Sequence, residues 1–247
     1  MAESELIYKM AFTHYNTKAF FIEEEAGREA DYLFTVFSRE FGKLKVRGKS
    51  IRKIKSKLRS GAQTLYLSDI EFIQGKIYKT LTEAVLIDKF RGIRQDLEKI
   101  KTTEKIAKNL DSLTGLEEKD YFIWDLLGKT LKIIDSEKNK EIIRYFFIWK
   151  LFSLLGYSPE LYRCSVCRRK LLPETFFFNP EKGGIICWRC FKKDNISFEI
   201  SVNTVKTLRI LIKEEWPLIK KLVLNREILA GLEKTTESYL AYLTFKS

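Results

Sequence analysis

The sequence predicts an α+β protein of several domains, with short strands in the first third of the chain and helices in the rest. Three observations favour this class. Residues 18–83 hold short apolar or alternating runs separated by glycine and charged residues. From Ala84 onward, apolar residues recur near every 3.6 positions, as they do on helices. Two C-x-x-C pairs then interrupt the helical part, which predicts a small inserted metal site.

The predicted strands follow one another through short links. They cover residues 18–25, 32–39, 43–49, 64–74 and 77–83. Five short strands with one helical insertion fit a small closed barrel better than a sandwich. We therefore expect an OB-fold barrel over residues 1–83.

The segment of residues 39–59 is strongly basic. It has ten cations and one acid, so its net charge of +9 makes up most of the formal charge of +12 of the chain. The cations from Lys43 to Lys49 alternate with apolar residues, which is the period of a half-buried strand and puts them on one face. After Ser50, the residues Ile51, Ile54 and Leu58 follow a helical spacing. The pattern predicts a basic strand that leads into a basic turn or helix.

A continuous positive surface of this kind is typical of proteins that bind a phosphate backbone. The alternative is a solvated face that keeps the chain in solution, but the acids that usually intersperse such a face are missing here. We therefore expect the barrel to bind nucleic acid through its cations. The expected binding residues are Arg39, Lys43, Lys45, Arg47, Lys49, Arg52, Lys53, Lys55, Lys57 and Arg59.

The remaining chain is predicted to be mostly helical. Helical spacing covers residues 84–113, 117–134 and 136–155, so we expect a helical domain over residues 84–160. Residues 202–215 and 218–245 predict further helices, in a segment of residues 197–247 that packs on this domain. Aromatic residues at helical spacing, such as Trp124 and Trp149, are expected in the core rather than in a ligand pocket.

The cysteine pattern predicts a zinc hairpin over residues 161–196. Two C-x-x-C pairs lie 19 residues apart, within the range for four thiolates on one ion, and the intervening residues read as a hairpin. A closed four-ligand set leaves no open position, so we expect one structural zinc per chain. The alternatives are two redox-active disulfides or four unrelated thiols. The expected ligands are Cys164, Cys167, Cys187 and Cys190.

Cations flank these cysteines. They are expected first to offset the charge of about −2 that four thiolates leave on zinc, and only second to contact nucleic acid. Neither second cysteine is followed by glycine, because Arg168 and Phe191 stand there. The flanking cations are Arg163, Arg168, Arg169, Arg189, Lys192 and Lys193.

The sequence offers no catalytic signature. It has no G-x-x-x-x-G-K-[ST] phosphate loop, and its one histidine, His14, has no nucleophile beside it in sequence. We therefore expect a protein that is not an enzyme. No apolar run approaches the ~20 residues of a membrane span, and the first residues lack the pattern of a secretion signal. We expect a cytoplasmic, nucleoid-associated protein with no membrane partner.

Three segments together resemble the bacterial RecO family of recombination mediators. LFTVFSREFGKL (residues 33–44) is similar to the "LFTREHGK" segment of that family, with Phe41 in place of its histidine. LGYSPEL (residues 155–161) precedes the first C-x-x-C pair, as in the zinc-bearing members of the family. YLAYL (residues 239–243) is similar to the final helix of the family.

This resemblance implies a function without chemistry. RecO proteins bind single- and double-stranded DNA and anneal complementary strands. Together with RecR they load RecA on DNA coated by single-strand binding protein, whose acidic C-terminal tail contacts their helical part. Two other functions remain open. An RNA-binding or ribosome-associated protein would use the same charge and barrel, and an enzyme of DNA metabolism would alter its substrate chemically.

Overall fold

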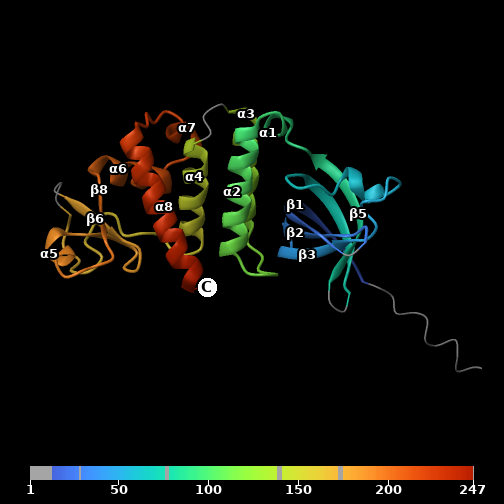
Figure 1. Cartoon of the computed structure of the whole chain (residues 1–247), viewed down its shortest axis with the longest axis horizontal. Coiled ribbons are helices and arrows are strands. Elements are labelled where there is room, and N and C mark those ends of the chain that lie inside the picture. The colour runs from blue at the N-terminus through green and yellow to red at the C-terminus, as the bar shows by residue number, and fades with distance from the viewer. Residues whose placement is uncertain (1–12, 28, 76–77, 138–140, 172–174, 247) are drawn as a thin grey trace, which may run out of the picture. The chain divides into compact units, whose positions relative to one another are not determined.

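The computed structural model describes residues 13–27, 29–75, 78–137, 141–171 and 175–246 (Figure 1). The chain divides into two compact units. The first, here the barrel unit, takes in the described part of Met1–Arg91 together with Thr114–Trp124. The second, the helical unit, consists of Gly92–Leu113 and the chain from Asp125 onward.

Five strands form the barrel unit, as the sequence predicts. They are β1 (His14–Ala26), β2 (Tyr32–Ser38), β3 (Gly42–Gly48), β4 (Leu67–Ile73) and β5 (Lys79–Asp88). Their order is β1-β2-β3-β5-β4, and β4 also pairs with β1, so each strand has two neighbours in a closed order. The closing pair of β3 and β5 is parallel and short, joining Val46 to Lys79 and Arg47 to Thr80.

The helix expected from Ala84 is wrong at its start. Strand β5 continues to Asp88 and pairs with β4, with Ser68 opposite Leu86. The apolar Leu86 and Ile87, which fit a helical stripe, are exposed residues of this strand. The periodicity of a short apolar run does not distinguish a helix from a strand. Here the pairing with β4 makes this run a strand.

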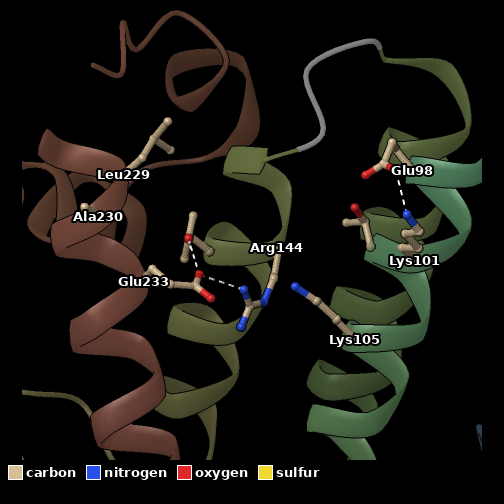
Figure 2. Close-up of a pocket in the computed structure, with 9 residues that line it drawn as sticks. Glu98, Lys101, Lys105, Arg144, Leu229, Ala230 and Glu233 are labelled. Atoms are coloured by element: carbon tan, nitrogen blue, oxygen red, sulfur yellow. Dashed lines mark hydrogen bonds and ion pairs between the residues drawn. The ribbon is translucent and has the colours of Figure 1, made fainter. Parts of the chain in front are cut away.

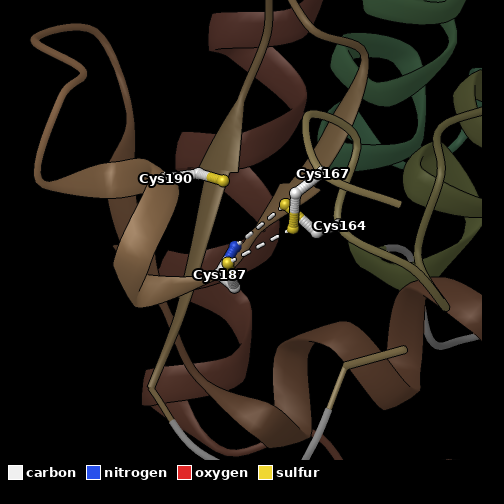
Figure 3. Close-up of side chains that lie close together, drawn as sticks. All are labelled: Cys164, Cys167, Cys187 and Cys190. Carbon is white, nitrogen blue, oxygen red and sulfur yellow. Dashed lines mark hydrogen bonds between the residues drawn. The ribbon is translucent and has the colours of Figure 1, made fainter. Parts of the chain in front are cut away.

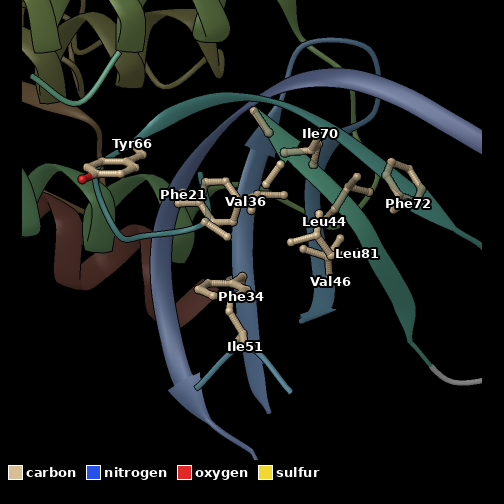
Figure 4. Packing of buried hydrophobic residues seen from close by; sticks show 13 residues of the cluster. Phe21, Phe34, Val36, Leu44, Val46, Ile51, Tyr66, Ile70, Phe72 and Leu81 are labelled. Carbon is tan, nitrogen blue, oxygen red and sulfur yellow. The ribbon is translucent and has the colours of Figure 1, made fainter. Parts of the chain in front are cut away.

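The barrel interior is filled by side chains from all five strands (Figure 4). On β3, Leu44 and Val46 are buried in this core, whereas Lys45 between them is exposed. The predicted alternation of β3 is therefore confirmed for these residues. Each large aliphatic or aromatic side chain buried here contributes about 1.5–3 kcal/mol to stability.

Residues 49–59, the basic turn, connect β3 toward β4 without an α-helix. Their only helical piece is the 3-10 helix η1 (Lys57–Ser60). The predicted helical stripe is wrong because Ile51 is buried and Leu58 packs on the barrel core, whereas Ile54 is 91% exposed. The chain turns back at Ser50, whose φ of 52° lies in the left-handed region. Two anchors near its ends, rather than a continuous face, hold the basic turn on the barrel.

The helical unit is organised around α4 (Glu141–Leu154), whose residues from Ile142 to Trp149 are all buried. This helix contacts α2, α6 and α8. Trp149 stacks on Tyr239 of α8 with ring centroids 5.9 Å apart, so the expectation of a core role for Trp149 is confirmed. The other helices are α1 (Arg91–Arg94), α2 (Leu97–Leu113), α3 (Tyr121–Ser136), α6 (Val202–Lys213), α7 (Trp216–Ile219) and α8 (Arg226–Lys246).

The cysteine segment folds as the predicted hairpin. Strand β6 (Phe176–Asn179) pairs with β7 (Gly184–Ile186), and the short helix α5 (Trp188–Phe191) follows. A third strand, β8 (Phe198–Ile200), pairs with the other side of β6 and is not foreseen in the sequence. Among the described helices, none combines the length and the apolar character that crossing a membrane requires.

Candidate nucleic-acid interface and metal centre

The outer face of β3 is only partly open. Lys45 is exposed and Arg47 is half-buried, but Lys43 is 8% exposed, so its expected place on an open face is wrong. The reason is a segment of the barrel unit that returns to this strand. The N–H of Glu117 donates to the carbonyl oxygen of Lys43 at 2.8 Å, and Leu116 forms a bridge with Lys43.

Carboxylates of the barrel unit lie beside three cations of the predicted interface. Arg47 donates from Nε to Asp31 Oδ2 at 2.8 Å, and its Nη2 lies 2.7 Å from the same oxygen. Lys45 Nζ lies 3.9 Å from a Glu25 oxygen, and Arg39 Nε lies 3.9 Å from Glu40. Part of the positive charge of the strand is therefore already balanced.

Asp31 also fixes the start of the basic turn. The backbone N–H of Ser50 donates to Asp31 Oδ1 at 2.6 Å. This hydrogen bond, followed by the hydrogen bond and charge of Arg47, keeps the pKa of Asp31 below its usual value despite burial. The carboxylate therefore stays ionised and holds the junction of strand and turn.

The cations of the basic turn are the most available ones. Lys53, Lys55, Lys57 and Arg59 are exposed, and within the described part of the chain none of them forms an ion pair. Ile51 and Leu58 fix this segment to the core, and the N–H of Arg52 donates to Ala30 O at 3.0 Å. The backbone is thus anchored while the charged groups face solvent. The exposed cations of the whole basic turn are Lys49, Arg52, Lys53, Lys55, Lys57 and Arg59.

Phe41 is part of the barrel rather than of an open surface. Its ring meets Tyr15 edge-on at 5.7 Å and Phe72 at 5.6 Å. In contrast, Ile54 projects from the basic turn among lysines. The sequence pattern placed Ile54 on a buried stripe, and nothing in that pattern signals its exposure.

The four cysteines meet as predicted, although they come from two separate segments (Figure 3). Their sulfur atoms all lie within 4.8 Å of one another, and Cys167 and Cys187 are 3.8 Å apart. Zinc–sulfur bonds of about 2.3 Å in a tetrahedron give sulfur–sulfur distances of roughly 3.8 Å. All four thiols are free, so the alternative of two disulfides does not describe this structure.

Backbone N–H groups near the cluster favour the ionised form of one of its thiols. Burial raises the pKa of Cys164, but N–H groups of Cys167, Cys187 and Val166 outweigh it and lower the pKa to about 6. The pKa of Cys190 is raised by burial and by its hydrogen bonds to the other thiols. Four such thiols cannot all ionise without a positive ion among them. The arrangement therefore fits a soft divalent metal.

Arg168 takes the conformation for which a metal knuckle usually has glycine. Its φ is 61°, and its N–H donates to the carbonyl oxygen of Cys164 at 2.9 Å. The carbonyl oxygen of Arg169 accepts from the N–H of Cys164 at 2.8 Å, which closes the turn. The missing glycine therefore does not prevent the geometry, although it leaves strain at Arg168.

The helical unit has a groove on its surface (Figure 2). This groove of about 430 Å³ lies among α2, α4 and α8 and is lined by Lys101, Lys105 and Arg144 as well as by acids. Arg144 is largely buried and pairs with Glu233 at 2.8 Å and with Glu237. Sequence reasoning missed this groove because its residues are up to 135 positions apart, from Glu98 to Glu233.

Two models of one protein family together match nearly the whole chain. A family model described as "Recombination protein O N terminal" matches residues 10–90, and one described as "Recombination protein O C terminal" matches residues 94–247.

Individual relatives cover the chain to a similar extent. The chain is 32% identical to a protein named DNA repair protein RecO from Dehalococcoides mccartyi, over 94% of this chain and 91% of the relative. It is 27% identical to a protein of the same name from Listeria welshimeri, over 88% and 85% of the two chains. A third, from Alkaliphilus metalliredigens, is 27% identical over 91% of each chain.

Proposed function

The chain belongs to the recombination protein O (RecO) family, and we propose that it is a DNA-binding recombination mediator that performs no chemistry. It binds single- and double-stranded DNA and promotes the annealing of complementary strands. With RecR it helps to load RecA on DNA coated by single-strand binding protein. The observation that carries this proposal is the basic turn, whose exposed cations are held on the barrel by Ile51 and Leu58.

We further propose that the barrel is an OB fold. The order β1-β2-β3-β5-β4 with a parallel β3–β5 closure supports this assignment. OB folds bind oligonucleotides on the face of their second and third strands and on the loops after the first and fourth strands. Lys45 and Arg47 lie on the third strand, and the basic turn follows it directly.

The proposed mechanism is electrostatic. Two complementary strands repel each other through their phosphates, and cations that bind one strand remove part of this repulsion. Because the basic turn has exposed lysines without carboxylate partners among the described residues, it neutralises phosphates at little cost in broken ion pairs. Six phosphate contacts would give a log-log salt slope of roughly −4 on single strands.

We assign a structural role to the metal site. The four thiols would hold one zinc ion per chain, and zinc would fix the two C-x-x-C turns and the β6–β7 hairpin between them. A set of four protein ligands leaves no position for a water or a substrate. The cysteine hairpin therefore contributes to folding rather than to a reaction.

The groove of the helical unit is our candidate for the acidic tail of single-strand binding protein. Lys101 and Lys105 of α2 line it together with the acids Glu98 and Glu233, and Leu229 and Ala230 of α8 give it apolar surface. An acidic peptide with apolar side chains would match both features. We do not assign residues to RecR, and RecA is expected to act only indirectly.

The remaining expectations stay part of this proposal. We divide the chain into barrel, helical domain, zinc hairpin and C-terminal helices, expected over residues 1–83, 84–160, 161–196 and 197–247. Because β5 runs to Asp88, the barrel extends past the first of these boundaries. We place the protein in the cytoplasm on the nucleoid, because its proposed ligand is chromosomal DNA.

Annealing of complementary strands coated with single-strand binding protein tests the function. Lys53, Lys55 and Lys57 are changed together to glutamate, which should abolish annealing because three phosphate contacts become repulsive. The matched control changes Lys108, Lys132 and Lys206, exposed lysines of the helical unit, to glutamate.

Three outcomes separate this proposal from its rivals. Equal loss in both triple variants would show that net charge, and not the basic turn, governs the activity. Preference for RNA over DNA of the same sequence would favour an RNA-binding protein. Chemical change of labelled DNA would indicate an enzyme.

A further inference from the structure

Trp188 differs from the other three tryptophans of the chain. Trp124, Trp149 and Trp216 are buried, whereas Trp188 is 49% exposed. It lies on α5 between the two cysteines of the second pair. An exposed indole in a folded hairpin is unusual, because tryptophan loses apolar burial there.

The Trp188 indole packs against two phenylalanine rings of the hairpin. Its ring lies 5.8 Å from the ring of Phe177 and 5.9 Å from that of Phe191. These two phenylalanines stack on each other at 3.7 Å with an angle of 8°. Trp188 is therefore a braced aromatic surface rather than a loose side chain.

Cations surround this surface. A pocket of about 240 Å³ is lined by Trp188 together with Arg169, Lys170 and Arg189, and no carboxylate of the described residues lines it. Lys192 Nζ lies 5.2 Å from the centroid of the Trp188 ring. In the described part of the chain, none of these cations forms an ion pair with an acid. The apolar side of the pocket comes from Leu171 and Phe176.

The negative charge of a four-thiolate zinc site is too small to balance the cations of the hairpin. Residues 161–196 carry eight cations and three acids, and a four-thiolate zinc adds a charge of about −2. A net charge of about +3 remains after the metal is balanced. Balancing a metal also needs no exposed aromatic ring.

We propose that the cysteine hairpin is a second contact for single-stranded nucleic acid. Trp188 stacks on one base, and Arg169, Lys170 and Arg189 bind the flanking phosphates. Sites for single strands combine these two features, an aromatic platform and a positive groove. A peptide of acidic residues alone would use the cations but would leave the indole without a matching partner. This contact rests on the proposed DNA binding and extends it beyond the barrel.

Tryptophan fluorescence tests the contact in the full chain. Oligothymidylate should quench the emission, because Trp188 is the indole that a base can reach. Trp188→Phe should remove the quenching and keep an affinity close to that of the wild type, since an aromatic platform remains. Trp188→Ala should weaken binding by about 5- to 150-fold, the range for loss of one stacked base. Each variant should hold as much zinc as the wild type.

Two further arms separate charge from stacking. Changing Arg169 and Lys170 to alanine should reduce the magnitude of the salt slope by about 1.4, because two phosphate contacts are lost. Trp188→Ala should leave this slope unchanged. An abasic phosphodiester of equal length should bind without quenching.

Three results would overturn the proposal. Oligothymidylate binding with no quenching and with normal affinity in Trp188→Ala would show that only the barrel binds DNA, and the proposed function would stand. Equal competition by polyglutamate, with no effect of Trp188→Ala, would identify the pocket as a site for acidic peptides. Absence of any DNA binding would refute both proposals together.

Discussion

The guanidinium of Arg47 lies 2.7 Å from the carboxylate of Asp31, which also accepts the N–H of Ser50. This pair joins the end of β3 to the turn before β2. The ion pair balances the charge of Arg47, a residue that the sequence predicts to bind DNA. The same carboxylate fixes the start of the basic turn. Most of the cations without a carboxylate beside them among the described residues of this segment therefore lie beyond Arg47, from Lys49 to Arg59.

Asp31→Ala should destabilise the barrel unit by about 1–3 kcal/mol, because a charged acceptor of two hydrogen bonds is lost. Urea unfolding at neutral pH measures this change. Asp31→Asn is the matched control, since its amide oxygen can still accept from Ser50 and only the pair with Arg47 is weakened. An Asp31→Ala variant as stable as the wild type would contradict the role of this junction.

The contribution of Asp31 should depend on pH. Its pKa is lowered in the folded state, first by the hydrogen bond from Ser50, so the unfolded chain binds its proton more readily. The stabilisation is therefore complete above the unfolded pKa of about 3.9 and is lost as the pH falls through the lower folded pKa. The difference in unfolding free energy between wild type and Asp31→Ala should shrink only below about pH 4. A difference that disappears near neutral pH would contradict this assignment.

Gly42→Ala should destabilise the barrel unit by about 2 kcal/mol or more. Gly42 has a φ of 67°, and a Cβ there would lie 2.0 Å from the carbonyl oxygen of Glu118. Gly156→Ala is the control, because Gly156 has a φ of 83° but no atom within 4 Å of its Cβ position. Thermal unfolding of both variants separates the clash from the conformational cost. Equal losses would show that segment 114–124 does not press on β3.

Removal of zinc should unfold the cysteine hairpin. Binding of a structural zinc contributes on the order of 10 kcal/mol to folding, and the hairpin has only a small apolar cluster of its own. Metal analysis of reduced protein should find one zinc per chain, and a strong chelator should abolish near-ultraviolet signals of Trp188. Replacing Cys164 and Cys187 by serine should give the same state without a chelator. Less than half an equivalent of zinc would contradict the site.

Arg168→Gly should tighten zinc binding about fivefold, which corresponds to roughly 1 kcal/mol of strain relieved at a φ of 61°. Competition with a chelator measures this change. Arg168→Ala removes the same charge but keeps the Cβ atom, so its zinc affinity should stay near that of the wild type. A gain of equal size in both variants would assign the effect to charge.

Local patterns predicted the five barrel strands and the meeting of the four cysteines. Alternation identified Leu44 and Val46 as core residues of β3, and C-x-x-C spacing identified the cysteine cluster. Both signals are local, because a strand has a period of two and a C-x-x-C turn places two thiols together.

Features that depend on distant segments were not predictable. Lys43 is buried by residues that follow it by more than 70 positions, and no local pattern announces this cover. Ile54 satisfied a helical spacing, but residues 51–56 form turns rather than a helix, and its side chain is exposed. The braced Trp188 and its pocket likewise require the fold of the whole hairpin.

The salt dependence of single-strand affinity tests the role of the basic turn most directly. Changing Lys53, Lys55 and Lys57 to alanine should reduce the magnitude of the log-log slope by about 2, because three phosphate contacts are lost. Changing Lys108, Lys132 and Lys206 to alanine should leave the slope as in the wild type. An unchanged slope in the first variant would contradict the proposed role of the basic turn in binding DNA.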